Sequence, residues 1–454
     1  MLITSKEANK NYLAKVVELK NIRKHENADR LRIVSIDFQD VIIGEGLQEG
    51  DKCIYFPVEA TINTRFLSFT NSFRDAKINE DLTTKGYFES NGRVRAVKLR
   101  GEKSCGCLFP IEQFMKFLGA VTNDRVGVDM FDVNAEFDYY DDILICEKYV
   151  VPVKQGGLGG NGKTGRTSKL SKIVENQFKF LEDTENFRKN HFKIQPEDEI
   201  TISTKVHGTS SITSHLLVKR ELNFLERMII KLRINFGKTP AIWKHLPEIR
   251  QDEYGIICSS RKVIKSVQED KIEGNSFYED DIWSICGNEL KEFIPKGISI
   301  FYEIVGYLPS SGAIQSKYDY SCEKNEHKIY VYKITYTNSD GKVFVIGSKE
   351  SEEFCKKIGF DFVPIHFHGT AKDYFPYNST EQSLDEWQKS FVRFLEERFL
   401  EGDCPICKNK VPFEGICIRK ESLVQYEVYK LKSFNFLLKE SKDLDAGIPD
   451  IEES

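Results

Sequence analysis

The residues best suited to chemistry begin with a lysine at the end of a predicted strand. The segment Ile200-Thr201-Ile202-Ser203-Thr204 alternates apolar and polar side chains, which is typical of a half-buried strand. Lys205 follows this strand directly, and Gly208 soon afterwards predicts a tight turn. A lysine amine has a reference pKa of about 10.4. It becomes a nucleophile when burial or neighbouring cations favour its neutral form.

Two carboxylates and a pair of lysines later in the chain supply the remaining charges for phosphate chemistry. Lys430 and Lys432 occupy alternate positions of a predicted strand, so both side chains point to one face and can neutralise a phosphate. Glu303 and Glu414 can hold a ribose or a hydrated Mg²⁺, a hard cation that prefers oxygen ligands. Glu303 stands inside an apolar strand, where an acid needs a partner.

In this order, the segments resemble motifs I, III, IV and V of the covalent nucleotidyltransferase superfamily, which contains polynucleotide ligases and capping enzymes. The resemblance covers residues 173–440. It implies a set of roles by position: Lys205 is adenylated, Glu303 belongs to motif III, Glu414 is associated with the metal, and Lys430 and Lys432 bind phosphate.

His207 indicates the branch of the superfamily. DNA ligases and capping enzymes usually have Asp at this position, whereas RNA ligases resembling phage T4 RNA ligase 2 and the kinetoplastid editing ligases have His. Those ligases often have Asn where Ser210 stands here. The resemblance implies further nucleotide-binding residues: Gln177 and Phe178 at the pocket entry, Gly208 in the motif I turn, Arg261 after motif I, and Tyr332 stacked on adenine.

The N-terminal residues 1–150 contain short β-like runs separated by turn signals, a pattern that predicts a small β-barrel. Segments 25–31 and 98–104 resemble the OB-fold tRNA-binding modules of aminoacyl-tRNA synthetases. A similar OB domain precedes the catalytic domain in Deinococcus-type RNA ligases. The resemblance implies nucleic-acid binding through basic and aromatic side chains. The basic candidates are Arg93, Arg95, Lys98 and Arg100.

The remaining segments suggest how the two parts are joined and how the chain ends. Residues 151–172 are rich in glycine and lysine and predict a flexible basic linker. Gly162-Lys163-Thr164 is followed by another glycine, which excludes a phosphate-binding loop that opens a helix. Beyond the linker, strand-like runs such as 298–303 mix irregularly with helix-like runs such as 383–400, which predicts an α+β fold. Residues 441–454 predict a frayed acidic tail.

Composition limits the setting of the protein. With 454 residues, 40% hydrophobic and 30% charged, the chain is typical of a soluble protein of two or three domains, and its net charge of −5 shows no global bias toward nucleic acid. We find no apolar run long enough to cross a bilayer and no signal-peptide core, so we expect no membrane partner.

The cysteines predict a compartment rather than a metal site. The 11 cysteines are scattered and odd in number, which favours the cytoplasm or another intracellular reducing compartment. Cys404 and Cys407 have zinc-knuckle spacing, but structural zinc takes four ligands and no second close Cys-x-x-Cys is present. We interpret them as ordinary thiols. We also expect a monomer.

The resemblance therefore implies an ATP-dependent RNA ligase that uses Mg²⁺ or Mn²⁺. It would join 3′-OH and 5′-phosphate RNA ends, free or in a nicked duplex, through a lysyl-AMP and an adenylylated RNA 5′ end. Two alternatives stay open. An mRNA capping guanylyltransferase is disfavoured by His207 and by the N-terminal position of the OB domain. A non-catalytic tRNA-binding or RNA-binding adaptor is disfavoured because all the charged motif positions are present.

Overall fold

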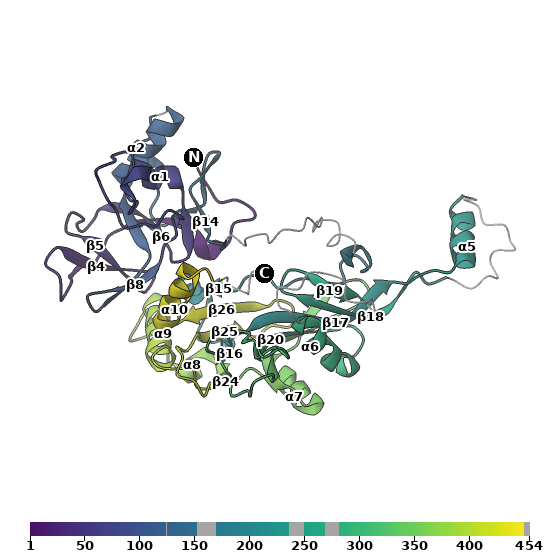
Figure 1. Cartoon of the computed structure of the whole chain (residues 1–454). Helices are drawn as coiled ribbons and strands as arrows, with labels where there is room; N and C mark the ends of the chain where they lie inside the picture. Colours follow the sequence, from purple (N-terminus) through teal and green to yellow (C-terminus); the bar gives the residue numbers. More distant parts are fainter. Residues whose placement is uncertain (124, 152–168, 236–248, 268–280, 449–454) are drawn as a thin grey trace.

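The computed structural model describes the whole chain except residues 124, 152–168, 236–248, 268–280 and 449–454. Figure 1 shows two lobes, each built of strands and helices, and the predicted α+β class is confirmed. Most of the predicted linker and the last residues of the predicted tail lie outside the described residues. Across the described part of the chain, every helix is too short or too polar to cross a membrane.

The N-terminal lobe, residues 1–151, consists of short antiparallel sheets. Its strands are β1 (Leu2–Ile3), β2 (Ala14–Glu18), β3 (Arg23–Lys24), β4 (Leu31–Ile36), β5 (Gln39–Gly44), β6 (Lys52–Phe56), β7 (Ala60–Ile62), β8 (Ala96–Leu99), β9 (Glu102–Cys105), β10 (Cys107–Pro110), β11 (Glu136–Phe137), β12 (Tyr139–Tyr140), β13 (Ile143–Leu144) and β14 (Cys146–Lys148). The largest sheet has the order β10-β6-β2-β11. The described strands pair in separate sheets and form no closed barrel. The OB-fold assignment of this lobe stays a prediction.

Two helices, α1 (Thr64–Phe69) and α2 (Ile111–Thr122), help to form the core of this lobe. Helix α2 buries Phe114 and Phe117 at helical spacing. The ring of Phe66 on α1 packs edge-on against Phe114, with 5.4 Å between centroids, and lies 5.2 Å from the ring of Phe117. The N-terminal lobe therefore has a hydrophobic core of its own.

The C-terminal lobe is built on two sheets. The five-stranded sheet has the order β15 (Glu185–Asn186), β26 (Glu427–Lys432), β25 (Gly415–Lys420), β16 (Glu199–Thr204) and β24 (Ile365–Thr370). The other sheet has the order β19 (Ile264–Val267), β18 (Asp252–Ser260), β17 (Thr209–Lys219), β20 (Ile298–Gly306), β21 (His327–Thr337) and β22 (Val343–Val345), and β23 (Asp361–Phe362) pairs with β21. Strands β16 and β17 are consecutive in the chain, so the turn between them connects the two sheets.

The principal helices of this lobe are α4 (Phe187–Asn190), α5 (Phe224–Asn235), α6 (Ile282–Leu290), α7 (Ser348–Ile358), α8 (Ala371–Tyr374), α9 (Leu384–Phe399) and α10 (Phe434–Asp445). Helix α9 confirms the helix predicted over residues 383–400. It begins with a capping box in which the Ser383 and Glu386 side chains bond to each other's backbone N–H groups. Trp387 and Phe391 of this helix are buried and stack at 5.3 Å.

Helix α10 joins the two lobes. One small hydrophobic cluster at this contact comprises Val58, Ala96, Cys105, Phe434 and Leu437. Ser441, in the last turns of the helix, is only 2% exposed. The predicted boundary between the domain and a frayed tail at residue 440 therefore needs correction, because the helix continues to Asp445 and Ser441 in its last turns bonds to the N-terminal lobe.

Candidate active site

Strand pairing brings Lys205 next to Glu414. Lys205 directly follows β16, and Glu414 directly precedes β25, the antiparallel neighbour of β16 in the sheet. The backbone N–H of Lys205 donates to the carbonyl oxygen of Gly415 at 2.9 Å. The Lys205 Nζ atom lies 2.7 Å from Glu414 Oε1, and the Glu414 side chain is 1% exposed. Two residues separated by more than two hundred positions therefore form a buried ion pair.

The turn after Lys205 is held from several sides. The Nδ1 atom of His207 lies 3.9 Å from Glu414 Oε2, and its backbone N–H donates to the Tyr320 hydroxyl at 2.6 Å. Gly208 has no room for a side chain, because an added Cβ would lie 2.3 Å from the carbonyl oxygen of Ile304. The glycine is therefore required by the close approach of this turn to β20.

Lys430 and Lys432 reach the same region from β26. Cys417 pairs with Lys430 and Gly415 with Lys432, so β26 runs alongside the strand that begins at Glu414. The Lys432 Nζ atom lies 3.8 Å from Glu414 Oε1 and 3.0 Å from Glu440 Oε1. Lys430 lines a pocket together with Lys205. Lys430 therefore shares the pocket of Lys205, whereas Lys432 lies outside that pocket and shares only the partner Glu414.

The opposite side of the pocket belongs to the other sheet. Glu303 of β20 pairs with Ser210 of β17, and the Ser210 hydroxyl lies 2.9 Å from the hydroxyl of Tyr332 on β21. Burial, and next the charge of Glu303, hold the pKa of Tyr332 well above its usual value, so this phenol stays neutral. Arg261 forms an ion pair with Asp183 at the pocket.

This pocket between the two sheets brings together Lys205, Arg261, Glu303, Tyr332 and Lys430 of the predicted set. Its other lining residues include Thr184, Thr201, Ser203, Ser348, Cys417, Arg419 and Tyr426. A hollow with a lysine amine at one wall and cationic, hydroxyl and aromatic groups at the others can accept a phosphorylated, aromatic ligand. The arrangement suits attack by the amine on a phosphoryl group.

The sequence did not predict a role for three side chains in or beside this region: Lys333, Arg419 and Tyr426. Arg419 is 4% exposed, and its guanidinium lies 5.3 Å from the Tyr426 ring centroid. The Lys333 ammonium lies 4.1 Å from the same ring. Burial, aided by the charge of Arg419, lowers the pKa of Lys333 to about 8. The sequence does contain a signal for Arg419 and Lys333. Each is a charged residue within an apolar strand, and a charge that points inward needs a buried partner.

Gln177 and Phe178 do not line the pocket, in contrast to their predicted role at its entry. The Gln177 side chain is 2% exposed and donates to the carbonyl oxygen of Asn338 at 2.9 Å. Phe178 packs edge-on against Phe180 with 5.1 Å between ring centroids. Gln177 therefore hydrogen-bonds to a neighbouring loop, and Phe178 packs against another aromatic ring. Neither side chain is directed into the cavity wall.

Arg93 requires a correction too, because the structure buries it between the lobes. Its side chain is 1% exposed, and Nη1 lies 3.0 Å from Glu59 Oε1. Nη2 donates to the carbonyl oxygen of Ser441 at 2.9 Å and pairs with the carboxylate of Asp445. Arg95 also pairs with Asp445, at 3.2 Å. Arg93 is therefore inaccessible to RNA in this arrangement, whereas Lys98 and Arg100 are exposed.

No protein-family model and no curated protein matches the sequence. Among solved structures, the chain is similar to a mutant RNA ligase of Naegleria gruberi with ATP and Mn, with a TM-score of 0.54 and 15% identity over 94% of this chain and 98% of that chain. A second mutant of that ligase, with AMP and Mn, gives a TM-score of 0.52 at 15% identity over 94% and 98%. The same ligase with PPi gives 0.52 at 14% identity over 95% and 99%. This likeness shows a shared fold across both lobes.

Proposed function

We propose that this chain is an ATP-dependent RNA ligase of the covalent nucleotidyltransferase superfamily, joining 3′-OH and 5′-phosphate RNA ends. The observation that carries the proposal is the Lys205 amine, which lines a pocket and lies 2.7 Å from the buried carboxylate of Glu414. The Naegleria gruberi RNA ligase structures with ATP, AMP, PPi and Mn support it, because ATP is the substrate of the proposed reaction and PPi and AMP are its products.

In the first step, the Nζ atom of Lys205 attacks the α-phosphorus of ATP. A P–N bond forms, the bond to the bridging oxygen breaks, pyrophosphate leaves and the amine loses its proton. Glu414 lies close enough to receive that proton. Lys430 lines the pocket and Lys432 lies 3.8 Å from Glu414, so both can stabilise negative charge that develops on the phosphates.

The next two steps use the same groups. An oxygen of the RNA 5′-phosphate attacks the phosphorus of lysyl-AMP, the P–N bond breaks, and Lys205 regains a proton. The oxygen of the RNA 3′-OH then attacks the adenylylated 5′-phosphate and loses its proton to solvent; a phosphodiester forms, the P–O bond to AMP breaks and AMP leaves. The polar and aromatic lining, including Tyr332 and Arg261, would hold the adenosine and its phosphate in place through these steps.

We infer that Mg²⁺ or Mn²⁺ accompanies ATP. Glu414 and Glu303 are 2% and 9% exposed; Glu303 lines the pocket, and Glu414 lies 2.7 Å from the pocket residue Lys205. Oxygen donors of this kind fit a hard divalent cation that retains water, so these two residues would hold it. When bound, such a cation neutralises phosphate charge in the transition state. The lysines perform the same task from β26.

We further infer that residues 1–150 form an OB-type domain that holds RNA beside the nucleotidyltransferase domain of residues 173–440. Lys98 and Arg100 are exposed near the β8–β9 hairpin and can contact phosphates. Replacing both with Ala should weaken RNA binding and make it less dependent on salt, because fewer counterions are released. Binding measured against salt concentration tests this, and an unchanged slope would remove these two residues from the interface.

Nucleotide labelling tests the proposed function. Full-length protein is incubated with Mg²⁺ and α-labelled ATP or GTP, and covalent label is measured on denaturing gels. We expect label from ATP alone, discharge by pyrophosphate, and sealing of nicked RNA. Lys420→Ala serves as the matched control, because Lys420 pairs with Asp198 at 2.9 Å and does not line the pocket. Label from GTP instead would indicate a capping-type enzyme, and label from neither nucleotide would refute nucleotidyl transfer.

A further inference from the structure

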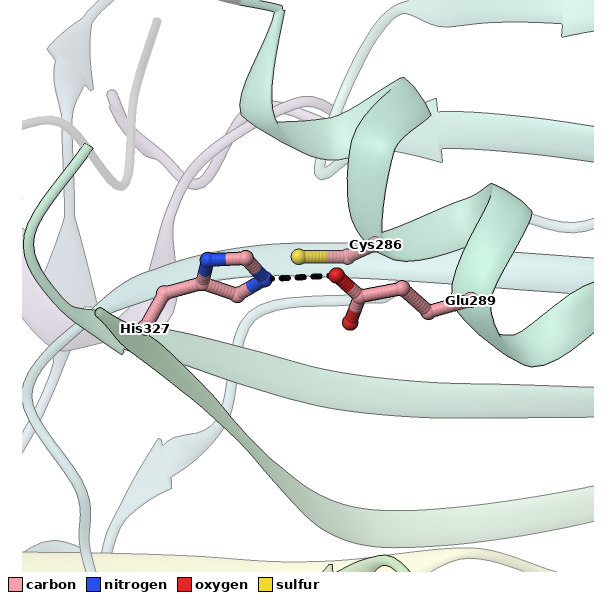
Figure 2. A group of neighbouring side chains, drawn as sticks. All are labelled: Cys286, Glu289 and His327. Atoms are coloured by element: carbon pink, nitrogen blue, oxygen red, sulfur yellow. Dashed lines mark hydrogen bonds and ion pairs between the residues drawn. The ribbon is translucent and has the colours of Figure 1, made fainter. Parts of the chain in front are cut away.

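A second group of potential ligand side chains lies where α6 meets the start of β21, on different residues from those of the pocket. Cys286 and Glu289 belong to α6, and His327 is the first residue of β21. Figure 2 shows the three side chains pointing toward one another. The His327 Nε2 atom lies 3.0 Å from Glu289 Oε1, and the three potential ligand atoms all lie within 4.8 Å of one another.

The fold fixes this convergence. Residues three apart on a helix share a face, so Cys286 and Glu289 project together from α6. Gly287 lies between them and allows α6 to approach β18 closely, because a Cβ added there would lie 2.3 Å from the sulfur of Cys258. His327 pairs with Gly306 at the end of the β20–β21 ladder. The ligand atoms are therefore presented by packed elements of regular structure.

The donor set matches a borderline transition metal. Zinc binds thiolate sulfur, imidazole nitrogen and carboxylate oxygen at about 2.0–2.3 Å, so donors in a tetrahedral site lie roughly 3.3–3.8 Å apart. The distances of 3.0 Å and up to 4.8 Å bracket that range. Mg²⁺ is disfavoured, because it prefers oxygen ligands. A three-residue set leaves a fourth position for water, on the side where the Glu289 side chain is 42% exposed.

The alternative to a metal site is an ordinary ion pair between His327 and Glu289 beside a buried thiol. His368 and Glu199 form such a pair elsewhere, with the same 3.0 Å separation. What distinguishes the His327 pair is the Cys286 sulfur, which is completely buried and shares the ligand geometry. Metals bind the thiolate form of cysteine, so binding at Cys286 would release a proton.

We propose that Cys286, Glu289 and His327 bind a zinc-class divalent ion that clamps α6 to the start of β21. The same strand carries Tyr332 at the pocket, so the ion would stabilise the sheet that forms one pocket wall. The site is independent of the proposed ligase function, since none of its three residues lines the pocket.

Cobalt substitution tests the site. Full-length, reduced, metal-free protein is titrated with Co²⁺, and absorption from thiolate-to-cobalt charge transfer is recorded. We expect this absorption in the wild type and its loss in Cys286→Ser and in His327→Gln. Cys355→Ser and His368→Gln are matched controls that should keep it, because Cys355 is a completely buried thiol of the same core cluster and His368 belongs to a geometrically similar pair.

The main competing thiols are Cys404 and Cys407, so Cys404→Ser is included. Loss of the absorption in Cys404→Ser and its retention in Cys286→Ser would overturn the proposal, as would the absence of thiolate absorption in the wild type. Metal bound by the pocket carboxylates would give no thiolate absorption. A change in the pocket, such as Lys205→Ala, should therefore leave the cobalt spectrum like that of the wild type. A failed ligase assay and a failed metal assay are therefore distinguishable.

Thermal unfolding gives a second measurement on the folded proteins. Zinc at about a hundredfold excess over its dissociation constant should raise the wild-type Tm by roughly 2 °C or more. His327→Gln, whose side chain replaces a partly exposed ring, should unfold cooperatively and show no zinc-dependent rise. An equal rise in the wild type and in His327→Gln would overturn the site even if Cys286→Ser failed to fold.

Discussion

Two buried groups of charges in this molecule contain similar residues and serve different ends. In the C-terminal lobe, Lys205 lies 2.7 Å from Glu414 and its side chain is 13% exposed at a pocket. Between the lobes, Arg93 lies 3.0 Å from Glu59 and its side chain is 1% exposed. The first amine can reach a ligand, whereas the second cation is enclosed by protein. Access to a pocket, more than charge, separates a pair that can meet a ligand from one that cannot.

The two groups differ in how the chain builds them as well. The Lys205 group depends on strand pairing within one sheet, because β16, β25 and β26 are neighbours. The Arg93 group depends on the contact between two lobes, where Ser441 Oγ also donates to Glu59 Oε1 at 3.0 Å. Loss of charge in the first group should therefore affect chemistry, and loss of charge in the second should affect stability.

The largest effect is expected for Lys205→Ala. Without the amine no P–N bond can form, so covalent labelling by ATP should fall to background. The buried Glu414 carboxylate keeps Lys432 at 3.8 Å, so the Tm should fall but the protein should still unfold cooperatively. Gel labelling and thermal unfolding measure the two quantities on the same preparation. Persistent labelling of a folded Lys205→Ala protein would place the nucleophile elsewhere.

Replacing the groups around the amine should give the next largest effect. Glu414→Ala and Lys430→Ala each remove a preorganised charge, which typically costs about a hundredfold or more in rate. We expect single-turnover adenylation to slow by at least that factor, and Lys420→Ala to retain the wild-type rate. Near-normal rates in Glu414→Ala would contradict the assignment of this carboxylate.

The inter-lobe cluster should respond in stability. Arg93→Ala leaves the buried Glu59 carboxylate without its guanidinium partner, which typically costs about 3–5 kcal/mol. Arg95→Ala removes only a more exposed contact to the same Asp445, so we expect about 0–1 kcal/mol. Denaturant unfolding of the two variants provides the comparison. Equal stabilities would mean that the enclosed cluster does not hold the lobes together.

The smallest effect concerns the pH dependence of stability. Burial raises the pKa of Glu59 from 4.5 to about 7, against the opposing influence of Arg93. Since the folded state holds this proton more tightly than the unfolded state, the contribution of Glu59 to stability declines as pH rises from about 4.5 to 7. Glu59→Gln cannot titrate, so its free energy of unfolding should decline less across that window. Parallel curves for the two proteins would contradict the raised pKa.

Much of the local structure followed from the sequence. The alternation before Lys205 predicted a strand that ends at that residue, and β16 ends at Thr204. The alternate spacing of Lys430 and Lys432 predicted one strand face, and both side chains line one further pocket from β26. These predictions succeeded because strand periodicity repeats every two residues and needs no information from distant segments.

Long-range packing decided the rest. Arg93 is one of several arginines and lysines in a basic stretch, and Glu59 together with the end of α10 encloses it. Gln177 is buried against the loop at Asn338, and the Arg419 guanidinium donates to the carbonyl oxygen of Ile346 at 2.7 Å. Residue type and spacing determined which groups could do chemistry. The tertiary structure alone decided which of them share a cavity, since burial depends on contacts between segments far apart in the chain.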